Sequence, residues 1–134
     1  MEYTTKVFKY KVERYVGGKL SDIIINGKVL PAIEYANGTR EYYKNGKLHR
    51  DDDPVLGPMP AIEYADGSKA YFRNNKRHRD DDPKLGPMPA IEWANGDKDY
   101  YKDGIQFTPP EPDQYKLKLI KMRDELDTVI KSLN

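Results

Sequence analysis

Short stretches of apolar and aromatic residues alternate with polar ones along most of this chain, and pairs such as Asn-Gly and Asp-Gly interrupt them at regular intervals. Asn or Asp followed by Gly adopts positive φ at low cost, which favours two-residue hairpin turns. Alternating segments rich in Tyr and Ile between such turns are typical of strands. Residues 31–59 are therefore predicted to form a three-stranded antiparallel meander, with strands at 32–36, 39–44 and 47–50.

The predicted meander recurs along the chain. Residues 60–88 repeat residues 31–59 with identity at 20 of 29 positions, and residues 89–110 form a third copy that fades after Gly104. Residues 1–30 contain a degenerate copy, which is expected to cap the array because an end repeat has no neighbour on one side. The fold class predicted is mainly β: a tandem repeat of three-stranded meanders with period 29, forming an elongated sheet over residues 31–110.

Two-residue turns would fix which side chains share a face. They would place Ile33 opposite Tyr42 and Tyr42 opposite His49 on an apolar core face. They would also place Tyr35 opposite Arg40, and the equivalent pairs Tyr64–Lys69 and Trp93–Lys98 opposite each other, as cation–π neighbours. The other face, which carries Tyr43, Phe72 and Tyr101, is expected to be exposed to solvent.

The segments between meanders read D-D-D-P-x-L-G-P-M-P, a composition that excludes helix and interior strand. Four apolar side chains in these connectors are expected to tuck inward: Leu56, Met59, Leu85 and Met88.

The pattern changes after the prolines at positions 109, 110 and 112, and residues 111–134 are predicted to form an amphipathic helix. Its apolar residues follow a heptad-like spacing, with a seam of Leu119, Met122, Leu126, Val129 and Leu133. Two interpretations stay open. The seam packs on the chain's own sheet, or it forms a homodimer with a second copy of the chain.

Composition narrows the possible functions. Hydrophobic residues make up 37% of the 134 residues and charged residues 34%, and the net charge is +1, so no overall field attracts a polyanion. The chain has no cysteine, which excludes disulfides, thiolate metal sites and Cys nucleophiles. No segment resembles a signal peptide or a membrane span, and a cytoplasmic protein without membrane contact is expected.

The repeat resembles the MORN-like Tyr/Gly β-hairpin repeats of phage and giant-virus proteins. The resemblance rests on Asn37-Gly38, Tyr42-Tyr43 and His49-Arg50, which recur in residues 60–88, and it covers residues 31–108. Here the Asp-Gly-Pro-Ala turn typical of that family is replaced by a longer connector. The resemblance implies a non-catalytic β-repeat encoded by a virus or phage, and it implies no particular partner, because such repeats serve many. A viral or phage factor that engages a host protein is the function we expect.

The duplicated His-Arg-Asp-Asp-Asp segments, at 49–53 and 78–82, concentrate the reactive groups. Clustered carboxylates can hold Ca²⁺, and histidine beside carboxylates can do acid–base work. However, consecutive Asp side chains diverge, and the third copy has Phe107 where histidine would stand. The preferred interpretation is structural: His stacks on Tyr, Arg pairs with a carboxylate, and Asp caps the following turn.

No catalytic or nucleotide-binding motif is present, and neither a catalytic residue nor a metal or cofactor is expected. The sequence predicts a non-enzymatic module that binds another protein. The residues assigned to the contact are Arg50, Asp51, Asp52, Asp53, Arg79, Asp80, Asp81, Asp82, Tyr43, Phe72 and Tyr101. The alternatives are a nucleotide or nucleic-acid binder that uses the aromatic and basic side chains of the sheet, and a structural assembly protein that oligomerises through its helix.

Overall fold

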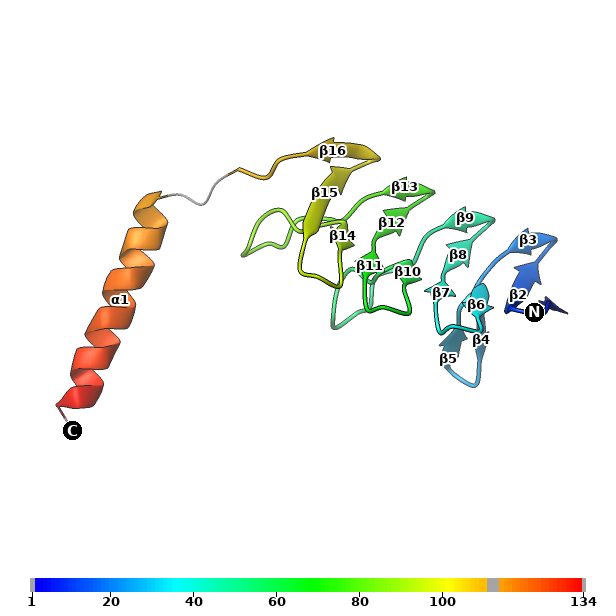
Figure 1. The fold of residues 1–134 in the computed structure, drawn as a ribbon, viewed down its shortest axis with the longest axis horizontal. Coiled ribbons are helices and arrows are strands. Elements are labelled where there is room, and N and C mark those ends of the chain that lie inside the picture. Colours follow the sequence, from blue (N-terminus) through cyan, green and yellow to red (C-terminus); the bar gives the residue numbers. More distant parts are fainter. Residues whose placement is uncertain (1, 111–113, 134) are drawn as a thin grey trace.

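The chain forms a row of short antiparallel strands followed by one helix, as seen in a computed structural model that describes residues 2–110 and 114–133. Figure 1 shows the strands stacked from the N-terminal end to the third repeat, with the helix beyond the last strand. The strands are β1 (Thr4–Val7), β2 (Lys11–Val16), β3 (Lys19–Leu20), β4 (Ile23–Ile25), β5 (Lys28–Leu30), β6 (Ile33–Tyr35), β7 (Arg40–Glu41), β8 (Tyr43–Lys44), β9 (Lys47–Leu48), β10 (Ile62–Glu63), β11 (Lys69–Ala70), β12 (Phe72–Arg73), β13 (Lys76–Arg77), β14 (Ile91–Glu92), β15 (Lys98–Lys102) and β16 (Ile105–Phe107). The fold class predicted from the sequence is confirmed.

One ten-stranded antiparallel sheet runs through all the repeats, in the order β1-β2-β6-β7-β10-β11-β14-β15-β16, with β3 paired to β2. Each repeat contributes one hairpin to this ladder, and β7 pairs with β10 as β11 pairs with β14. Since neighbouring strands lie about 4.8 Å apart, two strands per repeat give a rise of roughly 9.6 Å per repeat.

A second row of hairpins stands beside the ladder. The predicted strand 39–44 is interrupted at Tyr42, so that β7 belongs to the ladder while β8 pairs only with β9. The second repeat breaks in the same way at Tyr71, and in the third repeat β15 runs through without a break. Figure 1 shows the two rows, with β8–β9, β12–β13 and β15–β16 along one edge. Each full repeat is thus two hairpins joined at a bend rather than one continuous meander.

The register prediction is wrong at the first turn of each repeat. Ile33 lies opposite Glu41 rather than Tyr42, and Arg40 lies opposite Glu34 rather than Tyr35. The reason is a three-residue loop: Tyr35 N–H donates to Thr39 O, and the loop ends at Gly38 with φ 98°. The same shift pairs Lys69 with Glu63 and Lys98 with Glu92, so the three predicted cation–π pairs are not cross-strand partners.

The second turn follows the prediction. Asn45 and Gly46 have φ values of 52° and 78°, as a two-residue type I′ turn requires, and Tyr43 lies opposite Leu48.

The core is thin and repeats with the sequence. The alanines at positions 32, 61 and 90 are fully buried, and they are followed by the buried isoleucines 33, 62 and 91. The prediction that the second face is exposed to solvent is wrong in all three repeats. Ala70 is 2% exposed and packs in a cluster with Ile62 and Ile91, against which Leu48, Phe72 and Tyr101 also pack. The bend between the two rows brings these second-row side chains back over the ladder.

The connectors differ from expectation in their leucines. Leu56 and Leu85 are 72% and 75% exposed, while Met59 and Met88 are half-buried. Each connector forms a tight turn closed by a backbone bridge, Asp53–Gly57 or Asp82–Gly86. The leucine lies in this turn, called the connector tip below, and is therefore held away from the sheet.

The C-terminal helix α1 spans Gln114–Ser132. All five seam residues are exposed, from Leu119 at 47% to Leu133 at 78%, so the structure gives no packing of the seam on the sheet. Among the residues that the structure describes, no helix is long and apolar enough to cross a membrane.

Candidate functional site

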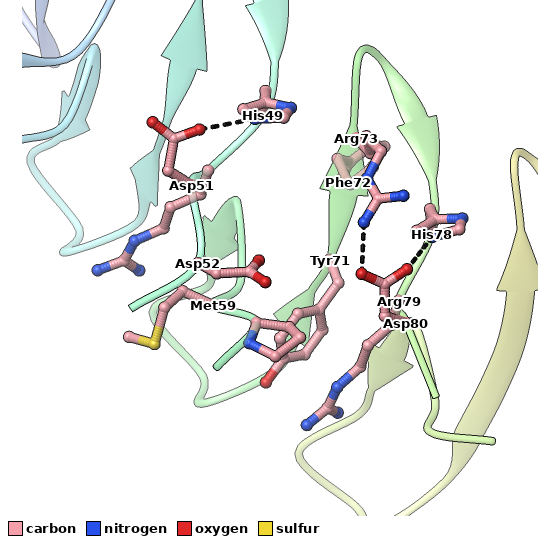
Figure 2. Close-up of a pocket in the computed structure, with 12 residues that line it drawn as sticks. His49, Asp51, Asp52, Met59, Tyr71, Phe72, Arg73, His78, Arg79 and Asp80 are labelled. Carbon is pink, nitrogen blue, oxygen red and sulfur yellow. Dashed lines mark hydrogen bonds and ion pairs between the residues drawn. The ribbon is translucent and has the colours of Figure 1, made fainter. Parts of the chain in front are cut away.

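Two grooves with equivalent linings lie between successive repeats. One of about 370 Å³ separates the capping repeat from the first full repeat, and one of about 260 Å³ separates the first repeat from the second. Each is lined by an aromatic residue, a basic residue, a histidine, an arginine and an aspartate: Tyr43, Lys44, His49, Arg50 and Asp51 in one, and Phe72, Arg73, His78, Arg79 and Asp80 in the other. Figure 2 shows the second groove, with His49, Asp51 and Asp52 on the first repeat and Tyr71, His78 and Asp80 on the second.

Each histidine links its repeat to the next one. His78 Nδ1 accepts a hydrogen bond of 3.0 Å from the backbone N–H of Asp103, and His49 Nδ1 accepts one of 3.3 Å from Asn74. A backbone N–H can only donate, so Nδ1 is unprotonated and the Nε2–H of each ring donates to a carboxylate, Asp51 or Asp80. The histidines therefore have a structural role that differs from the predicted stacking on tyrosine.

Each arginine forms a clamp across the same boundary. The guanidinium of Arg79 lies 4.0 Å from the ring centroid of Tyr71 and donates to Pro89 O and Glu92 of the next repeat. Arg50 makes the same set of contacts with Tyr42, Pro60 O and Glu63. The predicted arginine–carboxylate pairing is confirmed, and both guanidinium groups are mostly covered.

The capping repeat builds this clamp from a different position. Arg14 donates to Pro31 O and to Glu34, which are the equivalents of the proline and glutamate contacts in the later repeats. Its backbone N–H donates to Ala32 O, as Tyr42 donates to Ala61 O. Arg14 thus stands where the later repeats have tyrosine and still delivers a guanidinium to the same place.

Each His-Arg-Asp-Asp-Asp segment ends in three consecutive aspartates, called the triad below. The first aspartate of each triad, Asp51 or Asp80, contacts two basic groups. Asp80 lies 2.8 Å from His78 Nε2 and 2.5 Å from Arg73, as the dashed lines in Figure 2 show. The hydrogen bond from His78 and the charge of Arg73 hold the pKa of Asp80 below its usual value. Partial burial raises the pKa of Asp51, but His49 and Lys44 outweigh that effect and the net shift is downward. Both carboxylates are therefore ionised and largely neutralised at pH 7.

The third aspartate of each triad caps the connector turn, as predicted. Asp53 accepts hydrogen bonds from the backbone N–H groups of Val55 and Leu56, and Asp82 accepts them from Lys84 and Leu85. These donors lower the pKa of both carboxyl groups. The assigned residues Asp53 and Asp82 thus position the connector tips.

The second aspartate of each triad, Asp52 or Asp81, is exposed. Asp81 forms an ion pair with Lys102 of the third repeat. Asp52 is exposed and lines both grooves, which makes it the carboxylate best placed to meet a partner. Beside it the connector tip exposes Val55 and Leu56, so a carboxylate and an aliphatic patch stand together at the rim.

The three assigned aromatic residues occupy equivalent places in the second row but differ in their contacts. Tyr43 is half-buried, and its hydroxyl donates to Glu41. Burial together with the charge of Glu41 raises the pKa of Tyr43 well above its usual value. Phe72 and Tyr101 pack against the core cluster, and Arg77 lies within 6.0 Å and 5.4 Å of their ring centroids. Tyr43 and Phe72 line the two grooves, Tyr101 lines neither, and all three are half-buried rather than freely exposed.

Sequence reasoning missed Asp22, which lies in the larger groove. Its Oδ1 accepts 2.9 Å hydrogen bonds from the backbone N–H groups of Ala32 and Tyr43, at the position where the later repeats have arginine. Desolvation raises the pKa of Asp22 to about 7 despite these two donors. The alignment of residue 22 with Arg50 and Arg79 could have identified Asp22 as unusual. A carboxylate at this position cannot make the hydrogen bonds that the two arginines donate to the next repeat.

Within residues 2–110 and 114–133 no group of three His, Asp or Glu side chains is arranged to hold a metal ion. The grooves and their rims instead combine ion pairs, half-buried aromatic side chains and the exposed aliphatic side chains of the connectors. These features repeat from one boundary to the next, as is typical of a contact surface. No protein-family model matches the chain, and no curated protein or solved structure matches it either. The fold and the grooves define a β-repeat protein with an open sheet.

Proposed function

We propose that this chain is a non-enzymatic binding module that contacts another protein through the row of grooves between its repeats. The observation that carries the proposal is the recurrence of one groove lining at two successive boundaries, with aromatic, basic, histidine, arginine and aspartate side chains in equivalent places. A surface that repeats every ~9.6 Å suits a partner with side chains at a matching spacing. Several equal contacts along such a row add up to a useful affinity even when each is weak.

The chemistry of the rim suggests the kind of partner. Asp52 is exposed beside Val55 and Leu56, while the other acidic side chains of the first triad are engaged within the fold. A partner segment that combines a basic side chain with aliphatic ones would pair with Asp52 and cover the connector tip. The resemblance to viral repeats extends the proposal to a host protein as partner and to the host cytoplasm as location; these two points remain predictions.

The test is affinity capture from host lysate with three forms of the full chain, followed by a binding measurement with the captured protein. Asp52→Lys reverses a charge that lines both grooves and that has no hydrogen bond or ion pair among the residues that the structure describes. Glu2→Lys makes the same charge change at an exposed position outside both grooves and outside α1, and serves as the matched control. We expect Asp52→Lys to weaken binding about tenfold or more and Glu2→Lys to leave it unchanged.

Two results would contradict the groove proposal. Equal binding by all three forms would place the contact elsewhere. Recovery of nucleic acid with a steep loss of binding as salt rises would favour the nucleic-acid alternative.

A second candidate function, assembly through the helix, is favoured by the exposure of the whole seam of α1. Basic residues gather in the first half of the helix, with Lys121 and Arg123 at its end, and acidic ones follow from Asp124 to Asp127. An antiparallel pair of helices would set the basic half of one copy against the acidic half of the other.

Light scattering on the full chain tests this assembly. Leu126→Asp removes a seam residue, and Thr128→Asp makes a charge of the same sign outside the seam. We expect a dimer for the wild type and for Thr128→Asp, and a monomer for Leu126→Asp. A wild-type monomer at high concentration would exclude assembly through the helix.

A further inference from the structure

Every repeat of the ladder binds the next one through the same backbone contacts. The hairpin β6–β7 presents its outer strand to β10, and β10–β11 presents its outer strand to β14. At both boundaries a tyrosine N–H donates to an alanine carbonyl at 2.7 Å: Tyr42 to Ala61 and Tyr71 to Ala90. In both cases the incoming strand is the segment Pro-Ala-Ile-Glu followed by an aromatic residue.

Side chains reinforce each boundary in three places. Thr39 Oγ1 accepts from Ala65 N–H, and Ser68 Oγ accepts from Ala94 N–H. The histidine accepts from the turn of the next repeat, and the arginine clamps the proline carbonyl and the glutamate. The incoming strand is thus bound at its proline and first alanine carbonyls, at its glutamate, and at the N–H of its second alanine.

The third repeat presents the same edge at Lys98, which no described strand covers, whereas Tyr100 on that edge is paired with Phe107 of β16. Lys98 and Tyr100 of β15 occupy the positions of Arg40 and Tyr42. In the part of the chain that the structure describes, β15 pairs at Lys98–Asp99 only with β14 of its own repeat. Tyr42 and Tyr71 are 4% and 7% exposed, whereas Tyr100 is half-buried, with Phe107 of β16 beside it in place of the strand of a following repeat.

The edge of the third repeat keeps the uncovered backbone groups of Lys98 and loses two of the side-chain contacts. An added strand would also have to displace Phe107 from Tyr100 to reach the N–H that corresponds to those of Tyr42 and Tyr71. Asp97, at the position of Thr39 and Ser68, retains a side-chain oxygen that can accept a hydrogen bond. Phe107 and Thr108 replace histidine and arginine, and the Phe107 ring packs edge-on against Tyr100 at 5.9 Å. An added strand would therefore be held more weakly than β10 or β14, as suits a reversible contact.

We propose that the outer edge of β15 accepts an extended strand from another protein, with the pattern Pro-Ala-aliphatic-acidic-aromatic. The ladder itself specifies this ligand, since β7 and β11 each bind such a strand in the same register. The alanine must be small because its equivalents are 0% exposed, and the aliphatic residue would extend the cluster of Ile62 and Ile91. Strand addition to an open sheet edge is a common mode of peptide recognition.

This surface is separate from the grooves, so its failure leaves the groove proposal intact. A competing occupant of the edge is β1 of a second copy. Strand directions alternate along the ladder, and β1 has the direction that an antiparallel neighbour of β15 requires. Such pairing would be head-to-tail and would build open chains that grow with concentration.

The probe is a synthetic peptide with the sequence of residues 31–39, PAIEYANGT, titrated into the isotope-labelled full chain and followed by amide NMR. We expect the amides of Lys98, Asp99 and Tyr100 to shift, with no shift of β1. A peptide in which aspartate replaces the isoleucine is the matched control and should not bind, because its side chain would carry a charge into the apolar cluster.

Two variants of the full chain sharpen the test. Phe107→His with Thr108→Arg restores the arginine contacts with the peptide's proline carbonyl and glutamate, and we expect peptide affinity to rise about tenfold, a gain that one or two hydrogen bonds to a charged group can supply. Lys98→Pro removes an N–H that points to the same side as that of Tyr100, and should abolish binding while the edge position tolerates proline.

Each remaining outcome overturns the proposal. Absence of edge shifts at millimolar peptide, or equal binding of the aspartate-containing control, would show that the edge does not recognise this strand. If the wild type forms concentration-dependent chains that Thr5→Pro in β1 dissolves, the occupant is a second copy instead.

Discussion

The second and third repeats begin with nearly the same sequence and differ in what lies beside them. The second repeat has a neighbour on both sides, and its Tyr71, His78 and Arg79 all reach into the third. The third repeat keeps the tyrosine at position 100 but has Phe107 and Thr108 in place of the histidine and arginine. The difference indicates that histidine and arginine are needed to hold the following repeat rather than to form the hairpin that carries them.

The largest effect expected from this comparison is at the tyrosines. Tyr71→Ala removes a 7% exposed ring under the Arg79 guanidinium and should lower the free energy of unfolding by about 3 kcal/mol. Tyr100→Ala removes a half-buried ring and should cost about 1 kcal/mol. Chemical denaturation of the two variants measures both values. Equal losses would mean that the outer side of Tyr100 is covered in solution.

Only part of this fold could be predicted from the sequence. Repetition, strand content and the Asn45-Gly46 turn follow from local propensities, and the buried isoleucines and tyrosines follow from the repeated apolar positions. The three-residue loop ending at Gly38 was not predictable from the Asn-Gly pair, because that pair also suits a two-residue turn. One residue of error there reversed the expected exposure of Ala70.

The candidate site was predicted in part for a related reason. The sequence identified the His-Arg-Asp-Asp-Asp segments, and the caps formed by Asp53 and Asp82 follow from local turn chemistry. The links from His78 to Asp103 and from Ser68 to Ala94 join residues about one period apart. Such contacts depend on how the repeats stack, which no local pattern specifies.

Exchanging the histidine and the phenylalanine tests the proposed division of roles. His78→Phe leaves the backbone N–H of Asp103 without its acceptor at a boundary where His78 is 8% exposed, and should cost about 2 kcal/mol. Phe107→His removes only an edge-on contact with Tyr100 and should cost under about 1 kcal/mol. Urea midpoints give the ranking. A larger loss for Phe107→His would show that the terminal repeat depends on that ring more than the interior one depends on its link.

The other end of the array gives a pH-dependent effect. The pKa of Asp22 is about 7 in the folded protein and 3.8 in the unfolded reference, so the folded state binds more protons between these values. Stability should therefore fall as pH rises from 4 to 7 and become level above 7. Asp22→Asn keeps an oxygen that can accept from Ala32 and Tyr43 but cannot ionise. It should remove the fall and gain about 1 kcal/mol at pH 8, after allowance for partial exposure. Thermal unfolding of both forms across this pH range is the measurement, and parallel curves would contradict the prediction.

The smallest effect is expected within a single connector, where two adjacent aspartates have different roles. Asp53 accepts the N–H groups of Val55 and Leu56, whereas Asp52 is exposed at the rim of both grooves. Asp53→Ala should speed amide exchange at Val55 and Leu56 severalfold and leave the global stability nearly unchanged, because the connector tip opens locally. Asp52→Ala should leave that exchange unaltered. Since hydrogen bonding lowers the pKa of Asp53, the wild-type protection should persist down to acidic pH and be lost only below the usual range of a carboxyl group. Loss of protection in Asp52→Ala as well would mean that the triad acts as one unit, and the separation between a structural and an accessible carboxylate would not hold.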